Sequence, residues 1–311
     1  MLEHLAALKP TIRQARMPVH NFILACLHPK GKDKMNTLST DKKLSVIASL
    51  LEGSSVRSTE RITGVHRDTI CRLLVDVGDR CDEIMNNHMR NLHCGFIQAD
   101  EIWCYVGKKD RRLRDGDSPE YGSQWVFVAM DEETKLVPVY TVGKRTEETT
   151  WYFVNDLADR LSSRVQLTTD GFIFYQRHVE DAFGSEVDFA QLIKLYGQYG
   201  QHDADAKYSP SPIVEVISRV RTGDPDPDRI CTSHIERQNL TMRMQMRRFT
   251  RLTNAFSKKL TNLKAACALH FAHYNFCRVH SSLRVTPAMA AGVSNRIWPL
   301  ETLLSPGQTS E

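Results

Sequence analysis

Three β-type runs in close succession constrain the fold of this chain more than any other feature. They are Phe96–Val106, Trp125–Met130 and Leu136–Val142, and polar connections join them. Successive β runs with short connections form an antiparallel meander. The polar segment Lys108–Gly122 lengthens the first connection. The three runs therefore predict one edge of a β-sheet.

Helical and β-type patterns alternate after this meander. In chain order they are a helix (Thr146–Leu161), a short strand (Val165–Thr168), a helix (Phe172–Phe183), a strand (Val187–Leu195) and a β-like run (Ile213–Val220). Two late helices follow, one from Ser233 and a long one over Asn254–Phe276. This order predicts an α/β fold with a mixed sheet flanked by helices.

Three short helical patterns precede the sheet: Asp41–Glu52, Val56–Thr63 and Arg67–Val77. Gly64 forms the second turn, as in a helix-turn-helix, whose last helix enters the major groove. Residues 35–80 are therefore predicted to bind DNA, with His66, Arg67 and Arg72 facing outward. The alternative is a small three-helix bundle with a solvated charged face. A charged helical connector is expected over residues 81–94.

At 311 residues, the chain has room for about two domains. Residues 1–34 are expected to be a poorly structured extension, with Met35 as the natural start. The alternative is a short helix that packs on the next domain. The catalytic domain is predicted over residues 95–293, followed by a tail over 294–311 whose end is expected to be disordered.

The composition, 41% hydrophobic and 25% charged, is that of an ordinary globular protein. No apolar run approaches 18 residues, which excludes a membrane span, and no secretory signal is present, which predicts a cytoplasmic protein. Eight cysteines without a C-x-x-C pair indicate reduced thiols rather than disulfides. Only Cys26 precedes the helix-turn-helix, so no zinc is predicted.

Basic residues are concentrated near the carboxyl end, although the net charge is only +4. From Arg237 to Arg284 there are ten Lys or Arg and no Asp or Glu. Such a stretch is typical of a surface that binds a polyanion. The DNA-contacting candidates here are Arg237, Asn239, Arg243, Arg247, Arg248, Arg251, Lys258 and Lys259.

Three carboxylates occupy positions that the predicted fold could bring together. Asp100 lies inside the first strand, Asp170 closes the short fourth strand, and Glu236 begins a late helix. An ionised residue on a buried sheet is costly unless it has a partner or a metal. The three acids are therefore predicted to hold two hard cations about 3.5–4 Å apart, Mg²⁺ or Mn²⁺, in a phosphoryl-transfer site.

Each acid has an alternative role. Ser233 and Glu236 match a capping box, in which Glu236 bonds back to the Ser233 backbone. Asp170 precedes Gly171 in a favourable turn pair. Asp100 could lie at the surface, with Glu101 or Asp131 taking its place. The joint fit of the three acids to one topology favours the metal site.

The motifs QADEIW, TTDG and HIERQN lie around these acids, and the block SHIERQNLTMRMQMRRFTRLTNAFSKKL and the closing HSSLRVTPAMAAG follow. Together they resemble bacterial insertion-sequence transposases of the DDE class, of the insertion-sequence-one type. The resemblance covers Met35–Val293. It implies an RNase H-like, retroviral-integrase-like catalytic domain with Asp100, Asp170 and Glu236 as metal ligands, and it makes Arg237 and Asn239 auxiliary.

The resemblance also implies a bacterial, nucleoid-associated location and an activity. A transposase would bind the terminal repeats of its element, cleave each end with Mg²⁺-activated water, and join the freed 3′-hydroxyl to target DNA. Holding two ends implies at least a dimer. The rivals are a helix-turn-helix transcriptional regulator, a nuclease or resolvase on the same fold, and a decayed copy. A regulator gives the three acids no reason to converge.

Overall fold

The structure is a computed structural model that describes residues 37–197, 211–250 and 253–304. The expectations for residues 1–34, Cys26, Arg251 and the end of the tail lie outside these ranges. From Leu38 onward the chain forms one compact unit. Within the described ranges, no helix is long and apolar enough to cross a membrane.

In the described residues, six strands form one mixed sheet in the order β3-β2-β1-β4-β5-β6. β1, β2 and β3 pair antiparallel, β4 and β5 run parallel to β1, and β6 pairs antiparallel with β5. The strands are β1 (Phe96–Val106), β2 (Gly122–Asp131), β3 (Val139–Gly143), β4 (Val165–Thr169), β5 (Val187–Tyr196) and β6 (Ile213–Thr222). The predicted mixed α/β fold is confirmed, with every predicted strand present.

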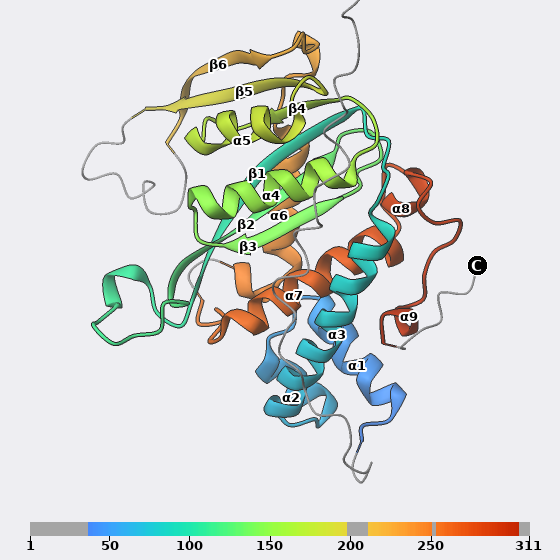
Figure 1. Cartoon of the computed structure of the whole chain (residues 1–311). Helices are drawn as coiled ribbons and strands as arrows, with labels where there is room; N and C mark the ends of the chain where they lie inside the picture. The colour runs from blue at the N-terminus through green and yellow to red at the C-terminus, as the bar shows by residue number, and fades with distance from the viewer. Residues whose placement is uncertain (1–36, 198–210, 251–252, 305–311) are drawn as a thin grey trace, which may run out of the picture. The chain divides into compact units, whose positions relative to one another are not determined.

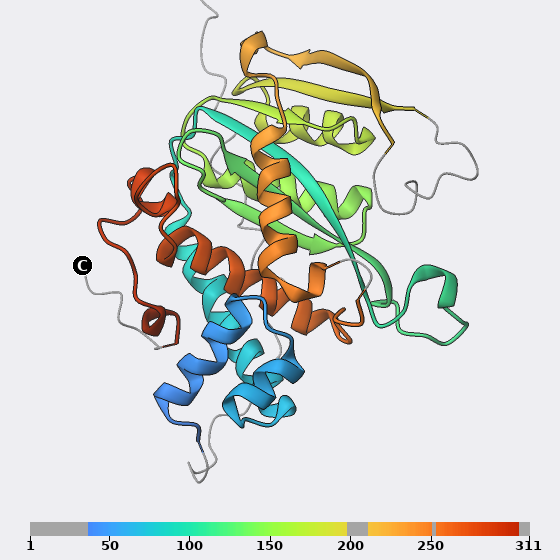
Figure 2. The ribbon, with the colours of Figure 1, turned by 180° about the vertical axis from the view of Figure 1, so that it is seen from behind.

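Helices cover both faces of the sheet. α4 (Glu147–Arg160) and α5 (Ile173–Phe183) lie on one face, and α6 (Ser233–Gln245) crosses the other, as Figures 1 and 2 show from opposite sides. The buried side chains of β2 and the central strands form the core between these layers, led by Phe127, Phe153 and Phe189. The centre of β1 is therefore enclosed from both sides.

The amino-terminal helices are α1 (Thr40–Leu51), α2 (Val56–Thr63) and α3 (Arg67–His88). Ser39 and Ser55 cap α1 and α2 by accepting bonds from backbone N–H groups, and Gly64 ends α2 with a left-handed φ of 70°. The three predicted helices are present. The third, however, continues to His88 as one 22-residue helix, so the predicted boundary near residue 80 falls inside it.

Gly78 lies inside α3, where it packs against another helix, instead of ending α3. A Cβ at this position would lie 2.5 Å from Ala265 Cα, on the helix α7 (Leu260–Ala272) that packs along α3. The glycine therefore permits a close helix–helix approach. Glycine more often ends a helix, so the predicted end at Val77 is wrong.

The carboxyl-terminal helices differ from the sequence prediction. α7 begins at Leu260 rather than Asn254, because Ser257 pairs with Val106 in a β-bridge. A π-helical turn, η7 (His273–Cys277), ends the predicted long helix. The remaining short helices are η3 (Asp110–Arg112), η5 (Pro227–Arg229), η6 (Arg247–Phe249), α8 (Pro287–Ala290) and α9 (Leu300–Leu304).

Candidate active site

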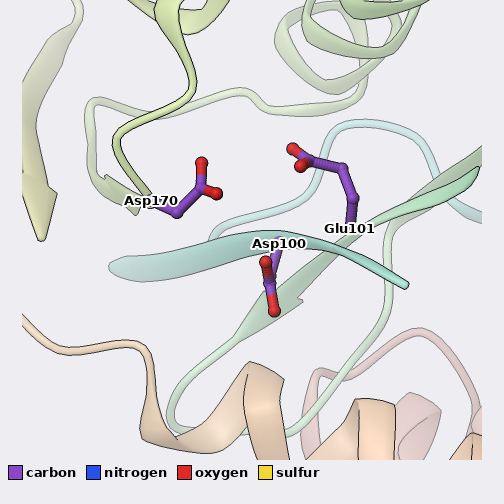
Figure 3. Close-up of side chains that lie close together, drawn as sticks. All are labelled: Asp100, Glu101 and Asp170. Carbon is purple, nitrogen blue, oxygen red and sulfur yellow. The ribbon is translucent and has the colours of Figure 1, made fainter. Parts of the chain in front are cut away.

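The parallel pairing of β1 and β4 brings two of the predicted acids together. Ala99 is paired with Thr169, so Asp100 and Asp170 are the next residues along the two neighbouring chains. One carboxylate oxygen each from Asp100, Glu101 and Asp170 lies within 4.8 Å of the other two. Figure 3 shows these three side chains around the centre of β1. The predicted proximity of Asp100 and Asp170 is confirmed.

Consecutive residues of β1 face opposite sides of the sheet. Gln98 and Asp100 face α6: the backbone N–H groups of His234 and Ile235 donate to Gln98 Oε1, and Asn239 Nδ2 donates to Asp100 Oδ2 at 2.8 Å. Glu101 points to the other side (Figure 3). Asp100 is thus the acid of β1 that shares a face with α6.

Glu236 lies in the first turn of α6, three residues before Asn239. Its Oε1 accepts a 2.6 Å hydrogen bond from Thr232 Oγ1 and forms an ion pair with Lys194 of β5. Its side chain is 46% exposed, and its negative charge contributes to raising the pKa of Asp100. Glu236 is therefore an accessible carboxylate on the Asp100 side of the sheet.

The capping-box interpretation of Glu236 is wrong. The helix begins one residue earlier than that motif requires, with Thr232 as its N-cap and Ser233 as its first helical residue. Ser233 Oγ contacts Cys231 Sγ at 3.8 Å, and the Glu236 carboxylate bonds the Thr232 hydroxyl instead of the Ser233 backbone. The capping-box role of Glu236, which was the alternative to metal binding, is therefore excluded.

Asp170 combines a turn role with a place in the acidic cluster. Its Oδ1 accepts a 2.9 Å hydrogen bond from the Phe172 backbone, which is the turn contact that the Asp170-Gly171 pair predicts. Its Oδ2 lies 3.2 Å from Arg145 Nη2.

Asp131, a sequence competitor for Asp100, lies at the end of β2 and accepts bonds from the backbone and hydroxyl of Thr134. Asp131 is therefore a turn residue outside the cluster.

A second network, on the Glu101 side, was missed by sequence reasoning. Arg145 Nη2 lies 2.9 Å from Glu101 Oε2 and also contacts Asp170, while Tyr175 donates its hydroxyl to Glu101 Oε1. The guanidinium stacks on the ring of Phe172, 3.9 Å from its centroid. Arg145 follows β3 in a connecting loop, where no periodicity marks it. Only Glu101 carried a sequence signal, as the neighbour of Asp100.

Burial raises the pKa values of all three clustered acids, and repulsion by Asp170 adds to this effect for Asp100 and Glu101. Desolvation, then the charge of Asp170, raises the pKa of Asp100 to about 6. The same two causes raise the pKa of Glu101 to about 8. Burial raises the pKa of Asp170, against the opposing effect of Arg145. A site that disfavours carboxylate charge in this way, with oxygen donors only, fits a hard divalent cation such as Mg²⁺ or Mn²⁺.

Replacing Arg145 with alanine is expected to lower any metal-dependent activity of this site about 10- to 100-fold, the usual cost of losing an outer partner of a metal ligand. Asp170 would lose the guanidinium that orients its Oδ2. Arg145→Lys should recover only part of the loss, because an ammonium cannot contact both carboxylates in the same fork. The measurement is the Mg²⁺ concentration needed for half-maximal activity. An unchanged requirement in Arg145→Ala would reduce Arg145 to a structural ion pair.

The predicted DNA-contacting residues of the amino-terminal helices are exposed. His66 is the N-cap of α3, and its Nδ1 accepts a bond from the Asp68 backbone. Arg67 lies 3.6 Å from Asp68, and Arg72 donates to Thr69 Oγ1. These weak surface contacts leave the arginine side chains accessible to a ligand.

The candidates after Glu236 differ in accessibility. Arg237, Arg247, Lys258 and Lys259 are exposed. Arg243 is half-buried, and its charge acts on Cys104 of β1. Asn239 is buried against Asp100, and half-buried Arg248 donates to Ser257 Oγ at 3.0 Å. Asn239 and Arg248 therefore contact protein groups.

No family model and no curated protein matches the chain. Among solved structures, it is similar to a piggyBac transposase synaptic complex with hairpin DNA, at 12% identity over 88% of this chain and 72% of that one, with a TM-score of 0.35. It is also similar to a Mos1 transposase paired-end complex with the left transposon end (14% identity, 51% and 61% coverage, TM-score 0.22). A Mos1 strand transfer complex gives 12% identity, 78% coverage of both chains and a TM-score of 0.21. These TM-scores and identities are too low to assign a function, so the function is inferred from the geometry of the site.

Proposed function

We propose that this protein is a DDE-class transposase of the insertion-sequence-one type, which cuts and joins DNA by metal-dependent phosphoryl transfer. The observation that carries the proposal is the meeting of Asp100 and Asp170 at adjacent positions of β1 and β4 in the centre of the sheet, with Asp100 facing α6, the helix that carries Glu236. Glu236 lies outside the group formed by Asp100, Glu101 and Asp170, and we expect its carboxylate to complete the site when a metal binds. The sequence motifs around each acid support the same assignment.

Asp100, Asp170 and Glu236 would hold the metal. Bound Mg²⁺ would supply a Lewis acid that activates the attacking oxygen and steadies the leaving oxygen of a phosphodiester. Asn239 orients Asp100 through its 2.8 Å hydrogen bond, and Thr232 orients Glu236. Lys194, which pairs with Glu236, is placed to contact a phosphate oxygen once that carboxylate binds a cation.

Glu236 is the preferred third ligand, although Glu101 lies closer to the other two acids. Both oxygens of Glu101 already have partners, Tyr175 and Arg145, and its side chain is only 1% exposed. DNA cannot approach the metal from that covered side. Glu236 is exposed on the opposite side, toward the basic residues that follow it. Glu101 is therefore assigned to positioning Asp170 through Arg145.

The helices α1–α3 would recognise the terminal repeats of the element. We expect the double variant Arg67→Ala, Arg72→Ala to lose repeat discrimination worth about 1–3 kcal/mol for each base contact removed. The measurement is competition binding between repeat DNA and a scrambled duplex of equal length. A uniform loss for both duplexes would assign the arginines to phosphates. Unchanged binding to both would remove α3 from the interface.

The proposed activity is tested with the full chain, Mg²⁺ and a linear duplex that carries the DNA flanking the gene, together with a supercoiled target. A transposase would nick at the repeat end and join it to the target, which gives a covalent product larger than either substrate. Two ends must be held together, so the active species is expected to be at least a dimer. Cleavage without joining would identify a nuclease, and repeat binding with no cleavage would identify a regulator.

A further inference from the structure

The connection between β1 and β2 carries a basic cluster that the proposed site does not use. The segment Lys108–Arg114 has the sequence KKDRRLR, with five Lys or Arg among seven residues. It forms an excursion that includes η3 and projects beyond the ends of the two strands (Figures 1 and 2). Lys109, Arg111, Arg112 and Arg114 are exposed.

Two of the four acidic residues of this excursion, Asp110 and Asp117, hold its structure together. Asp110 accepts a 2.7 Å bond from the Ser123 backbone and a second bond from the Ser123 hydroxyl. Asp117 accepts from the Arg114 backbone at 2.8 Å and pairs with Lys108. Arg111 and Arg112, by contrast, form no ion pair with any residue in the described ranges. Their charges are left for an outside partner.

A second basic segment joins the excursion at its base. Val106 and Ser257 form a parallel β-bridge, and the Gly107 backbone donates to Ser257 O at 2.9 Å. This pairing places the exposed Lys258 and Lys259 beside the start of the excursion. Two stretches that are about 150 residues apart in sequence therefore contribute to one positive surface.

Aromatic stacking holds the base of this surface in place. Tyr105 stacks on Phe256 with ring centroids 4.4 Å apart and on Trp103 at 5.8 Å. The ammonium groups of Lys109 and Lys258 lie over Tyr105 and Phe256. Cations fixed by stacking lose less conformational freedom when they bind a polyanion.

We propose that Lys109, Arg111, Arg112, Arg114, Lys258 and Lys259 form a second DNA-binding surface, the β1–β2 clamp, which holds backbone phosphates of duplex DNA. β1 carries Asp100 and leads directly into the connection that bears the clamp, so DNA held by the clamp would be aligned with the carboxylate site. The class of partner rests on the proposed function, because an unpaired basic cluster selects a polyanion and the nearby site acts on one. The clamp reads no sequence, since it contacts phosphates.

The test is binding of a fluorescein-labelled 30-base-pair duplex of random sequence to the full chain in EDTA, over a range of KCl concentrations. Each phosphate contact contributes about 0.9 to the slope of log K against log[salt]. Arg111→Ala, Arg112→Ala should lower the slope by about 1.8 and weaken binding at least several-fold at 0.1 M salt. Arg111→Lys, Arg112→Lys should keep most of the slope, because the charges remain.

A matched control removes two exposed arginines elsewhere, Arg219 of β6 and Arg296 after α8. Arg219→Ala, Arg296→Ala should bind as the wild type does. The clamp proposal is overturned if Arg111→Ala, Arg112→Ala has the wild-type melting temperature and keeps the wild-type slope of log K against log[salt]. If the wild type nevertheless cleaves DNA, the proposed function is supported and only the clamp proposal fails. Clamp-dependent binding by a wild type that never cleaves would support the clamp and overturn the proposed function.

Discussion

Asparagine in place of Asp100 is expected to reduce Mg²⁺-dependent DNA cleavage more than about 100-fold, beyond the usual cost of losing an outer partner of a metal site. The substitution keeps the shape of the side chain and removes only the charge that binds the cation. Its melting temperature should not fall, because burial already raises the pKa of Asp100 to about 6, so the ionised carboxylate destabilises the fold at neutral pH.

The matched control for Asp100→Asn is Asp131→Asn. Asp131 is also a buried acid of the sheet, but it bonds the backbone and hydroxyl of Thr134 and lies outside the acidic cluster. Asparagine keeps an oxygen that can accept both bonds from Thr134, so this variant should fold and preserve cleavage. Equal loss of cleavage in both variants would point to general damage and contradict the assignment of Asp100.

The second large expected effect is a Mg²⁺-dependent gain in stability that grows with pH. The pKa values of Asp100 and Glu101 are raised to about 6 and about 8, above their unfolded values of 3.8 and 4.5. The folded state therefore binds more protons than the unfolded state between about pH 4 and pH 8, and these groups lower stability as pH rises through that window. A cation that binds Asp100 replaces the proton of this carboxyl group and therefore restores stability at high pH.

Thermal unfolding in EDTA and in Mg²⁺, at pH 5 and pH 8, measures this linkage. At pH 8, saturation at 100 times the dissociation constant should add about 2.7 kcal/mol, and the gain at pH 5 should be smaller because protons compete with the ion. The same measurement on Asp100→Asn gives the contribution of the other titrating groups, and this variant should lose most of the Mg²⁺-dependent gain in stability. A gain of equal size in wild type and Asp100→Asn would place the ion elsewhere.

Much of the site could be predicted because strands and helices carry periodic patterns. Phe96–Val106 is a strand with the same bounds in the sequence analysis and in the structure, which placed Asp100 at its centre. Asp170 and Glu236 followed from the end of a short strand and the start of a helix. Their order along the chain predicted that all three acids would meet, and the structure confirms this for Asp100 and Asp170.

The features that escaped prediction depend on contacts between distant segments. Arg145 lies in a connecting loop, and only the fold brings it to Glu101 and Asp170. Ser257 lies in a stretch with a helical pattern, yet pairing with Val106 makes it extended. Gly78 has the signature of a helix end, but contact with Ala265 keeps it inside α3. In each case tertiary packing overrides the local preference.

The central claim is that Asp100, Asp170 and Glu236, rather than Glu101, hold the catalytic metal. It is tested most directly by Mn²⁺ binding, followed by electron paramagnetic resonance, in wild type, Glu236→Gln and Glu101→Gln, with cleavage of repeat-end DNA measured in parallel. Both glutamine variants keep the size of the side chain and remove one charge. We predict that Glu236→Gln loses tight Mn²⁺ binding and cleavage at an unchanged melting temperature, whereas Glu101→Gln retains Mn²⁺ binding and measurable cleavage. Retained binding and cleavage in Glu236→Gln, with both lost in Glu101→Gln, would contradict the account.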